Sequence, residues 1–182
     1  MGTLKTEPAR ARPDLLAPPV AAAIGQWSAD APVDVGDVLV APIEAGLADT
    51  AAFCAAYEVG LDVSANCVVI AGKRAGVLRY AACVVLATTR VDVNGVARRA
   101  LDVRKASFAP MADAVEATGM EYGGITPIGL PEDWPVLVDA RVIATPHVIV
   151  GSGVRHSKIA LPGPALGALP GALVVEGLAR PV

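Results

Sequence analysis

The sequence has few aromatic residues, few cysteines and no long uncharged apolar run, and the last of these argues against a membrane-spanning protein. Aromatic residues make up 4% of the 182 residues, whereas 54% are hydrophobic. No stretch of about 18 residues is apolar throughout, so we expect no membrane-spanning helix. The first 14 residues carry basic side chains but no apolar run before a cleavage site, so we expect no signal peptide.

Side chains that commonly bind metals or act as nucleophiles are also scarce. Cys54, Cys67 and Cys83 lie in apolar segments without metal-ligand spacing, which predicts core thiols in a reducing cytoplasm. His147 and His156 have no neighbouring cysteine or carboxylate at ligand spacing. Motifs for phosphate-binding loops and for the serine nucleophile of hydrolases are missing. We therefore expect neither a metal nor another cofactor.

The charge balance argues against a protein that coats nucleic acid. The chain has 18 acidic and 15 basic residues, a net charge of −3 and a pI of about 5.3. Proteins that track a nucleic-acid backbone usually have a basic domain. Brief contact with one end of an RNA needs only a few local cations. We expect no DNA and no membrane as partners.

Hydrophobic patterning predicts a single α/β domain over residues 14–182, preceded by a disordered extension over residues 1–13. Strands and short helices are interleaved, and tight turns join several strands, which predicts a mixed sheet of about seven strands. The predicted strands are 38–42, 66–71, 78–87, 106–109, 136–138, 148–150, 159–161 and 173–175, with 66–71 and 78–87 forming a hairpin. The predicted helices are 20–27, 49–58, 96–101 and 110–118.

Residues 121–131 form the most distinctive segment. Its three glycines and two prolines exclude regular structure. Glycine permits positive φ and the close approach of a ligand to bare backbone. Successive N–H groups in such a turn can bind an anion or donate to a developing oxyanion. An ordinary rigid loop fits the same pattern.

Two further segments are candidate walls of a pocket. Residues 150–158 lead from a strand through a turn rich in hydrogen-bond donors into another strand, although a solvated hairpin tip has the same pattern. Asn66 begins a strand and shares a face with Val68 and Ile70. A polar side chain there needs a hydrogen-bond partner, so Asn66 has either a functional or a purely structural role.

The order of these segments resembles the YbaK/EbsC family, which also occurs as an editing insertion in bacterial prolyl-tRNA synthetases. Residues 123–129 are similar to the family's Gly-Gly-x-Ser/Thr-Pro-x-Gly loop. The strand ending at Asp139 and the turn at 151–153 support the resemblance, which extends from about residue 47 to 177. The family fold implies a strongly twisted, barrel-like sheet flanked by short helices.

The resemblance implies an enzyme that acts in trans on mischarged tRNA. It would hydrolyse the ester of Cys- or Ala-tRNA with the proline anticodon, with an aminoacyl-tRNA synthetase as a further partner. The implied catalytic residues are Gly124, Thr126, Asn66 and Lys158, and the implied substrate-binding residues are Gly123, Ile125, Pro127, Gly129, Ser152, Gly153 and Arg155. The expected tRNA contacts are Lys73, Arg74, Arg98, Arg99, Arg104 and Lys105.

Two positions depart from the family pattern. Asn66 stands where members often carry a catalytically important lysine, and Lys158 stands where many carry aspartate. Lys158 would supply the missing cation from the opposite wall. Two alternatives stay open: a non-catalytic module that binds aminoacyl-tRNA, an amino acid or a nucleotide, and a hydrolase of small esters or acyl-adenylates.

Overall fold

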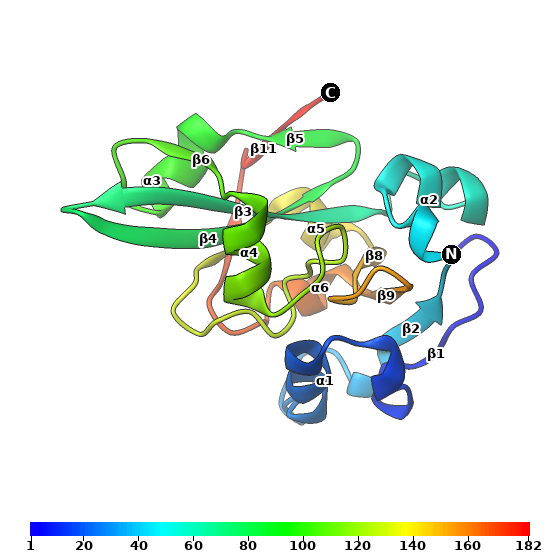
Figure 1. Cartoon of the computed structure of the whole chain (residues 1–182). Helices are drawn as coiled ribbons and strands as arrows, with labels where there is room; N and C mark the ends of the chain where they lie inside the picture. Colours follow the sequence, from blue (N-terminus) through cyan, green and yellow to red (C-terminus); the bar gives the residue numbers. More distant parts are fainter.

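The computed structural model describes residues 1–182 and contains strands in three sheets with short helices around them (Figure 1). The sheet orders are β1-β2-β9-β8, β10-β7-β4-β3-β6 and β11-β5. The strands are β1 (Glu7–Pro8), β2 (Leu39–Pro42), β3 (Ala65–Arg74), β4 (Val77–Leu86), β5 (Thr89–Val91), β6 (Ala106–Phe108), β7 (Val136–Asp139), β8 (His147–Gly151), β9 (Ser157–Pro162), β10 (Ala172–Val175) and β11 (Ala179–Pro181). The α-helices are α1 (Pro18–Gly25), α2 (Thr50–Tyr57), α3 (Arg98–Ala100), α4 (Met111–Thr118), α5 (Ala140–Ala144) and α6 (Gly163–Leu166).

The five-stranded sheet is mixed, which confirms the predicted α/β fold. β4, β7 and β10 run parallel to one another, whereas β3 pairs antiparallel with β4 and with β6. The structure has more strands than the expected seven, because the shortest ones, such as β1 and β11, are too short to show a hydrophobic period. None of the helices has both the length and the apolar character needed to cross a membrane.

The predicted hairpin is the longest feature of the sheet (Figure 1). Asn66 pairs with Val85, and pairing continues to Arg74 opposite Val77. Ala75 and Gly76 form the turn with φ of 49° and 82°. Two successive left-handed residues match the twist of a two-residue hairpin turn. Pairing therefore runs through a polar stretch that the sequence predicts as the turn.

Both faces of the five-stranded sheet are buried, which accounts for the abundance of small and β-branched residues. Val84 and Val138 face the larger hydrophobic core, whereas Cys83 and Leu137 face the smaller one. The buried Asp139 ends β7 and accepts hydrogen bonds from the backbone of Arg141 and of Ala179, both at 3.0 Å. It thereby joins the start of α5 to β11.

The N-terminal segment differs from its prediction. The sequence predicts disorder over residues 1–13, but β1 pairs with β2 through Glu7 opposite Val40. The side chain of Ala9 is fully buried in the larger core, where Leu15 and Leu16 also pack. The segment is polar in composition because only one of its sides meets the core.

Candidate active site

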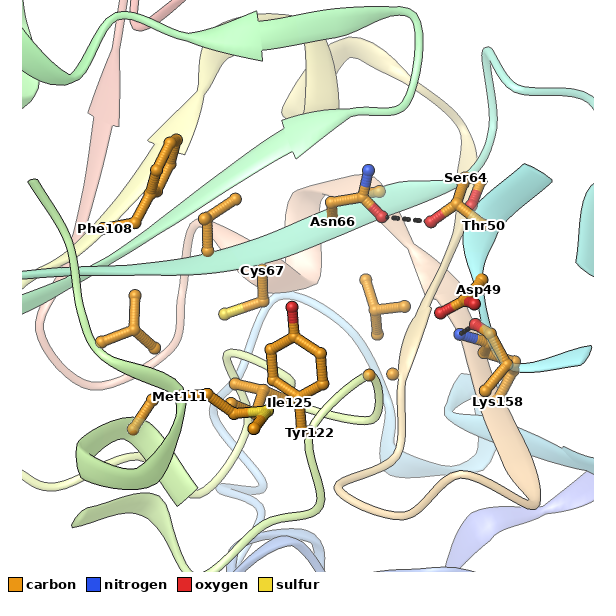
Figure 2. Close-up of a pocket in the computed structure, with 18 of the residues that line it drawn as sticks. Asp49, Thr50, Ser64, Asn66, Cys67, Phe108, Met111, Tyr122, Ile125 and Lys158 are labelled. Carbon is orange, nitrogen blue, oxygen red and sulfur yellow. Dashed lines mark hydrogen bonds between the residues drawn. The ribbon is translucent and has the colours of Figure 1, made fainter. Parts of the chain in front are cut away.

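A cavity of about 490 Å³ opens beside the first half of β3 (Figure 2). Its size lies within the range of small-molecule binding sites. The walls come from β3, the starts of α2 and α4, the glycine-rich loop, β8 and β9. The lining residues are Ala48, Asp49, Thr50, Ser64, Ala65, Asn66, Cys67, Val68, Val69, Phe108, Ala109, Met111, Ala114, Tyr122, Gly123, Ile125, Ile149, Val150, Gly151 and Lys158.

The cavity lies where one edge of β3 has no strand beside it. At one end, β8 reaches this edge and the N–H of Ile149 donates to Val63 O at 2.8 Å; at the other, the N–H of Ala109 donates to Val69 O at 2.9 Å. Backbone groups of alternate residues point to the same edge of a strand. Since Val63 and Val69 both face this edge, the N–H and C=O of Cys67 face it as well. The gap between β6 and β8 therefore presents main-chain groups to the cavity.

Polar side chains gather at one end of the cavity (Figure 2). α2 begins at Thr50, and Asp49 precedes it at the N-cap position. Thr50 Oγ1 donates to Asn66 Oδ1 at 2.7 Å. This bond supplies the partner that Asn66 needs, and it leaves the amide N–H groups of Asn66 as donors.

Lys158 enters the same end from β9 and is 9% exposed. Its Nζ donates to Ala48 O at 3.0 Å and lies 5.2 Å from the centroid of the Phe53 ring. Burial lowers the pKa of Lys158, and the nearby Asp49 carboxylate acts in the opposite direction by favouring the ammonium form. An ammonium has three donors, so Lys158 retains hydrogen-bonding capacity beyond the bond to Ala48.

Hydrogen bonds clamp the glycine-rich loop to the β8–β9 hairpin. The N–H of Glu121 donates to Gly153 O and the N–H of Gly153 donates to Gly124 O, both at 2.8 Å. A Cβ at Gly124 would lie 2.5 Å from Val154 O. Glycine is required at this position because the two segments approach so closely.

The amides of this loop are not equivalent. The N–H of Gly124 donates to Glu121 O at 2.9 Å, whereas those of Gly123 and Ile125 have no partner in the protein. Gly123 and Ile125 also line the cavity, while Gly124 is buried behind them. Of the loop residues that line the cavity, Gly123 and Ile125 thus have main-chain N–H groups that could donate to a bound carbonyl group, whereas the N–H of Gly124 is already engaged.

The structure brings only some of the predicted site residues to the cavity. Asn66, Lys158, Gly123 and Ile125 line it. Thr126 is fully buried elsewhere, and its hydroxyl has no hydrogen-bond partner. The predicted residues outside the lining are Gly124, Thr126, Pro127, Gly129, Ser152, Gly153 and Arg155.

Ser152 and Arg155 hold the walls of the cavity instead of lining it. The buried Ser152 Oγ donates to Ser157 O at 3.0 Å. The Arg155 guanidinium donates to Tyr122 O at 3.1 Å and to Ala45 O at 3.2 Å. Arg155 thus ties the glycine-rich loop to the segment before α2.

Sequence reasoning missed an apolar rim formed by Phe108, Met111 and Tyr122. These side chains are 54%, 57% and 59% exposed and line the cavity. It also missed Asp49 and Thr50 as lining residues. The sequence offered one indication: aromatic residues are scarce, so a phenylalanine or tyrosine in a polar segment is a candidate for ligand binding.

Four of the basic residues predicted to contact tRNA gather at the far end of β3. Gly72 pairs with Ala106, so the antiparallel register brings Lys105 next to Lys73. Arg74 forms an exposed ion pair with Asp102 at 2.9 Å. We call Lys73, Arg74, Arg104 and Lys105, all exposed, the hairpin-end cluster.

The cysteines are poorly suited to act as nucleophiles. Burial raises the pKa of the Cys67 thiol in the cavity wall and raises that of Cys83 to about 12. A thiol with such a pKa stays protonated and unreactive near neutral pH. No group of three or more histidine, cysteine or acidic residues is placed to hold a metal ion.

Comparisons with known proteins agree with this architecture. A solved structure described as a candidate trans-editing enzyme for prolyl-tRNA synthetase is 21% identical, with a TM-score of 0.72 over 88% of this chain and 94% of that one. The hypothetical protein APE2540 is 20% identical, with a TM-score of 0.67 over 78% of this chain and 90% of that one. No curated protein matches the sequence significantly.

At about 20% identity, the two structural matches show a shared fold only. A match to a sequence model of a protein family shows the family as well. The model described as the aminoacyl-tRNA editing domain matches residues 44–168. This range is more than half of the chain and includes every residue that lines the cavity. The chain therefore belongs to the aminoacyl-tRNA editing domain family.

Proposed function

We propose that the chain is an aminoacyl-tRNA deacylase that acts in trans on tRNA mischarged with a small amino acid, such as Cys- or Ala-tRNA with the proline anticodon. Family membership supports the reaction class, and the resemblance to a candidate trans-editing enzyme for prolyl-tRNA synthetase supports the choice of tRNA. One observation carries the proposal: Gly123 and Ile125, whose main-chain N–H groups have no partner in the protein, line the same cavity as the buried Lys158.

The proposed reaction needs no side-chain nucleophile. The oxygen of a water bonds to the acyl carbon, and the bond from that carbon to the 3′ oxygen of the ribose breaks. One proton of the water passes to the ribose oxygen and the other stays with the carboxyl product. Negative charge develops on the carbonyl oxygen, where the N–H groups of Gly123 and Ile125 donate. A preorganised donor of this kind stabilises the transition state by about 3 kcal/mol.

The polar end of the cavity supplies the remaining contacts in this proposal. Lys158 provides the cation that the family often carries at the position of Asn66, and its ammonium donates a hydrogen bond to the ribose oxygen while the bond breaks. The free amide hydrogens of Asn66 hold a ribose hydroxyl, because Thr50 occupies its oxygen. Asp49 pairs with the α-ammonium of the aminoacyl group. Selection among amino acids follows from size: the cavity excludes large side chains by steric clash. It distinguishes small side chains less well, because one methylene changes binding by only about 1–3 kcal/mol.

A panel of aminoacyl-tRNAs tests the proposal. We expect the chain to release cysteine or alanine from tRNA with the proline anticodon, and to leave the correctly charged prolyl-tRNA largely intact. Binding of these tRNAs without release of any amino acid would favour a non-catalytic binding module. One observation supports that alternative: the family's usual lysine is replaced by Asn66, whose side-chain oxygen already accepts a hydrogen bond from Thr50. Rapid hydrolysis of a free aminoacyl ester that full-length tRNA does not inhibit would favour a small-ester hydrolase.

A further inference from the structure

The open side of the cavity has an apolar rim that the proposed hydrolysis does not use. Phe108 belongs to β6, Met111 begins α4, and Tyr122 lies in the glycine-rich loop (Figure 2). All three side chains are more than half exposed and line the same cavity. Single exposed apolar residues are common on protein surfaces, but three around one opening indicate a binding surface.

The two aromatic rings of the rim are free to stack on a ligand. The aromatic pairs within the protein are Phe53 with Tyr57 and Tyr80 with Trp134, so neither Phe108 nor Tyr122 stacks on another ring. Exposed aromatic rings beside a basic surface are typical of proteins that bind single-stranded nucleic acid, because every base has a face that stacks.

The charge beside the rim fits such a ligand. Lys105 lies three residues before Phe108, and the register of β6 with β3 brings Lys73 beside Lys105. Both lysines and Arg104 are exposed. In single-strand binding sites, cations hold the phosphates while aromatic rings take the bases. The apolar rim and the hairpin-end cluster therefore follow one another along the same edge of the sheet.

We infer that Phe108, Met111 and Tyr122 form the binding site for the base of the 3′-terminal nucleotide of an RNA, and that Lys73 and Lys105 hold the phosphates that precede it. The inference rests on the proposed function, because it places the terminal ribose and its ester at the polar end beside Asn66 and Lys158. A cavity of about 490 Å³ accommodates a nucleoside together with a small aminoacyl group.

Binding of uncharged RNA tests the base site without requiring catalysis. The probe is an RNA minihelix with a single-stranded CCA end, and fluorescence anisotropy gives its Kd. We expect Phe108→Ala and Tyr122→Ala each to weaken binding about tenfold or more, and Phe108→Trp to retain it. The wild-type chain should show a similar loss with a minihelix whose terminal nucleotide is abasic.

Leu173→Ala is the matched control. Leu173 is 52% exposed and lies on β10, at the opposite edge of the five-stranded sheet from β6. Its replacement removes exposed apolar surface without touching the rim, so the Kd should not change. Thermal melting of all variants verifies that the fold is retained, as the exposure of the replaced side chains leads us to expect.

Salt dependence separates stacking from phosphate contacts. Lys105→Ala should reduce the slope of log Kd against log salt by about 0.7, whereas Phe108→Ala and Tyr122→Ala should leave the slope unchanged. Unchanged RNA affinity in both aromatic variants would overturn the base site, even if the chain deacylates tRNA. Weakened RNA affinity in those variants, with no hydrolysis of any aminoacyl-tRNA, would retain the base site and overturn the deacylase.

Discussion

Replacing Lys158 by methionine separates the charge of this side chain from its bulk. Methionine is unbranched like lysine, and its sulfur can rest against the Phe53 ring, whose centroid lies 5.2 Å from the lysine Nζ. The change removes the buried ammonium and its 3.0 Å hydrogen bond to Ala48 O. It leaves the main-chain amides of the glycine-rich loop in place.

The effects on stability oppose one another. Loss of the charged hydrogen bond to Ala48 costs about 1.5–3 kcal/mol, and loss of the contact between ammonium and ring costs about 1 kcal/mol. Burial of the ammonium is unfavourable, as the lowered pKa of Lys158 indicates, and the variant no longer has this cost. The variant also gains a sulfur–aromatic contact of about 1 kcal/mol. The quantified losses exceed the gain by about 1.5–3 kcal/mol, and relief of charge burial offsets part of this difference. We expect the free energy of unfolding to fall by less than about 3 kcal/mol, whereas kcat should fall about 10²–10³-fold.

Two measurements check this expectation. Release of alanine from mischarged proline tRNA under single-turnover conditions gives the rate of the chemical step, and denaturant unfolding gives the stability. Lys73→Met is the matched control, because the same change at the exposed hairpin-end cluster should weaken RNA binding and leave the chemical step intact. A folded Lys158→Met variant with the wild-type single-turnover rate would refute the role of Lys158 in the reaction.

Three other changes test separate parts of the structure. Because burial lowers the pKa of Lys158, the deacylation rate, corrected for spontaneous hydrolysis, should decline with rising pH before an ordinary lysine would titrate, and Lys158→Met should lack this decline. Gly124→Ala should lower stability by about 1–3 kcal/mol in denaturant unfolding and slow deacylation, because its Cβ would lie 2.5 Å from Val154 O; an unchanged midpoint would contradict the close packing. Asp139→Asn should cost about 2–3 kcal/mol at pH 7. Burial alone would raise the pKa of Asp139, but hydrogen bonds from Arg141 and Ala179 lower it overall, so the stability that Asp139 contributes is present above about pH 4 and lost as the pH falls through its folded pKa. Unfolding midpoints measured across acidic pH should therefore fall less steeply in the asparagine variant.

The sequence predicts features that depend on neighbouring residues. Glycine and proline interrupt regular structure wherever they cluster, so the loop around Gly123 stood out before its surroundings were known. Which of its amides is free depends on the hydrogen bond from Gly124 to Glu121, which only the folded turn reveals. The sequence therefore indicates the segment, but it does not show which N–H groups of the segment lack a partner.

Features that depend on distant contacts were missed. Phe108, Met111 and Tyr122 lie in three separate segments, and only the assembled structure shows that they share one opening. In the same way, Ala9 lies in a polar segment but is buried, because β1 pairs with a strand that begins at Leu39.

The interruption beside β3 has a consequence for how such a protein can diverge. No side-chain substitution removes the N–H of Cys67 from this edge except a change to proline, which lacks that hydrogen. Drift in the sequence therefore alters the size and charge of the site while its main-chain donors persist. A longer β6 or β8 would remove these free donors, because the added strand residues would form hydrogen bonds with the main-chain groups along this edge.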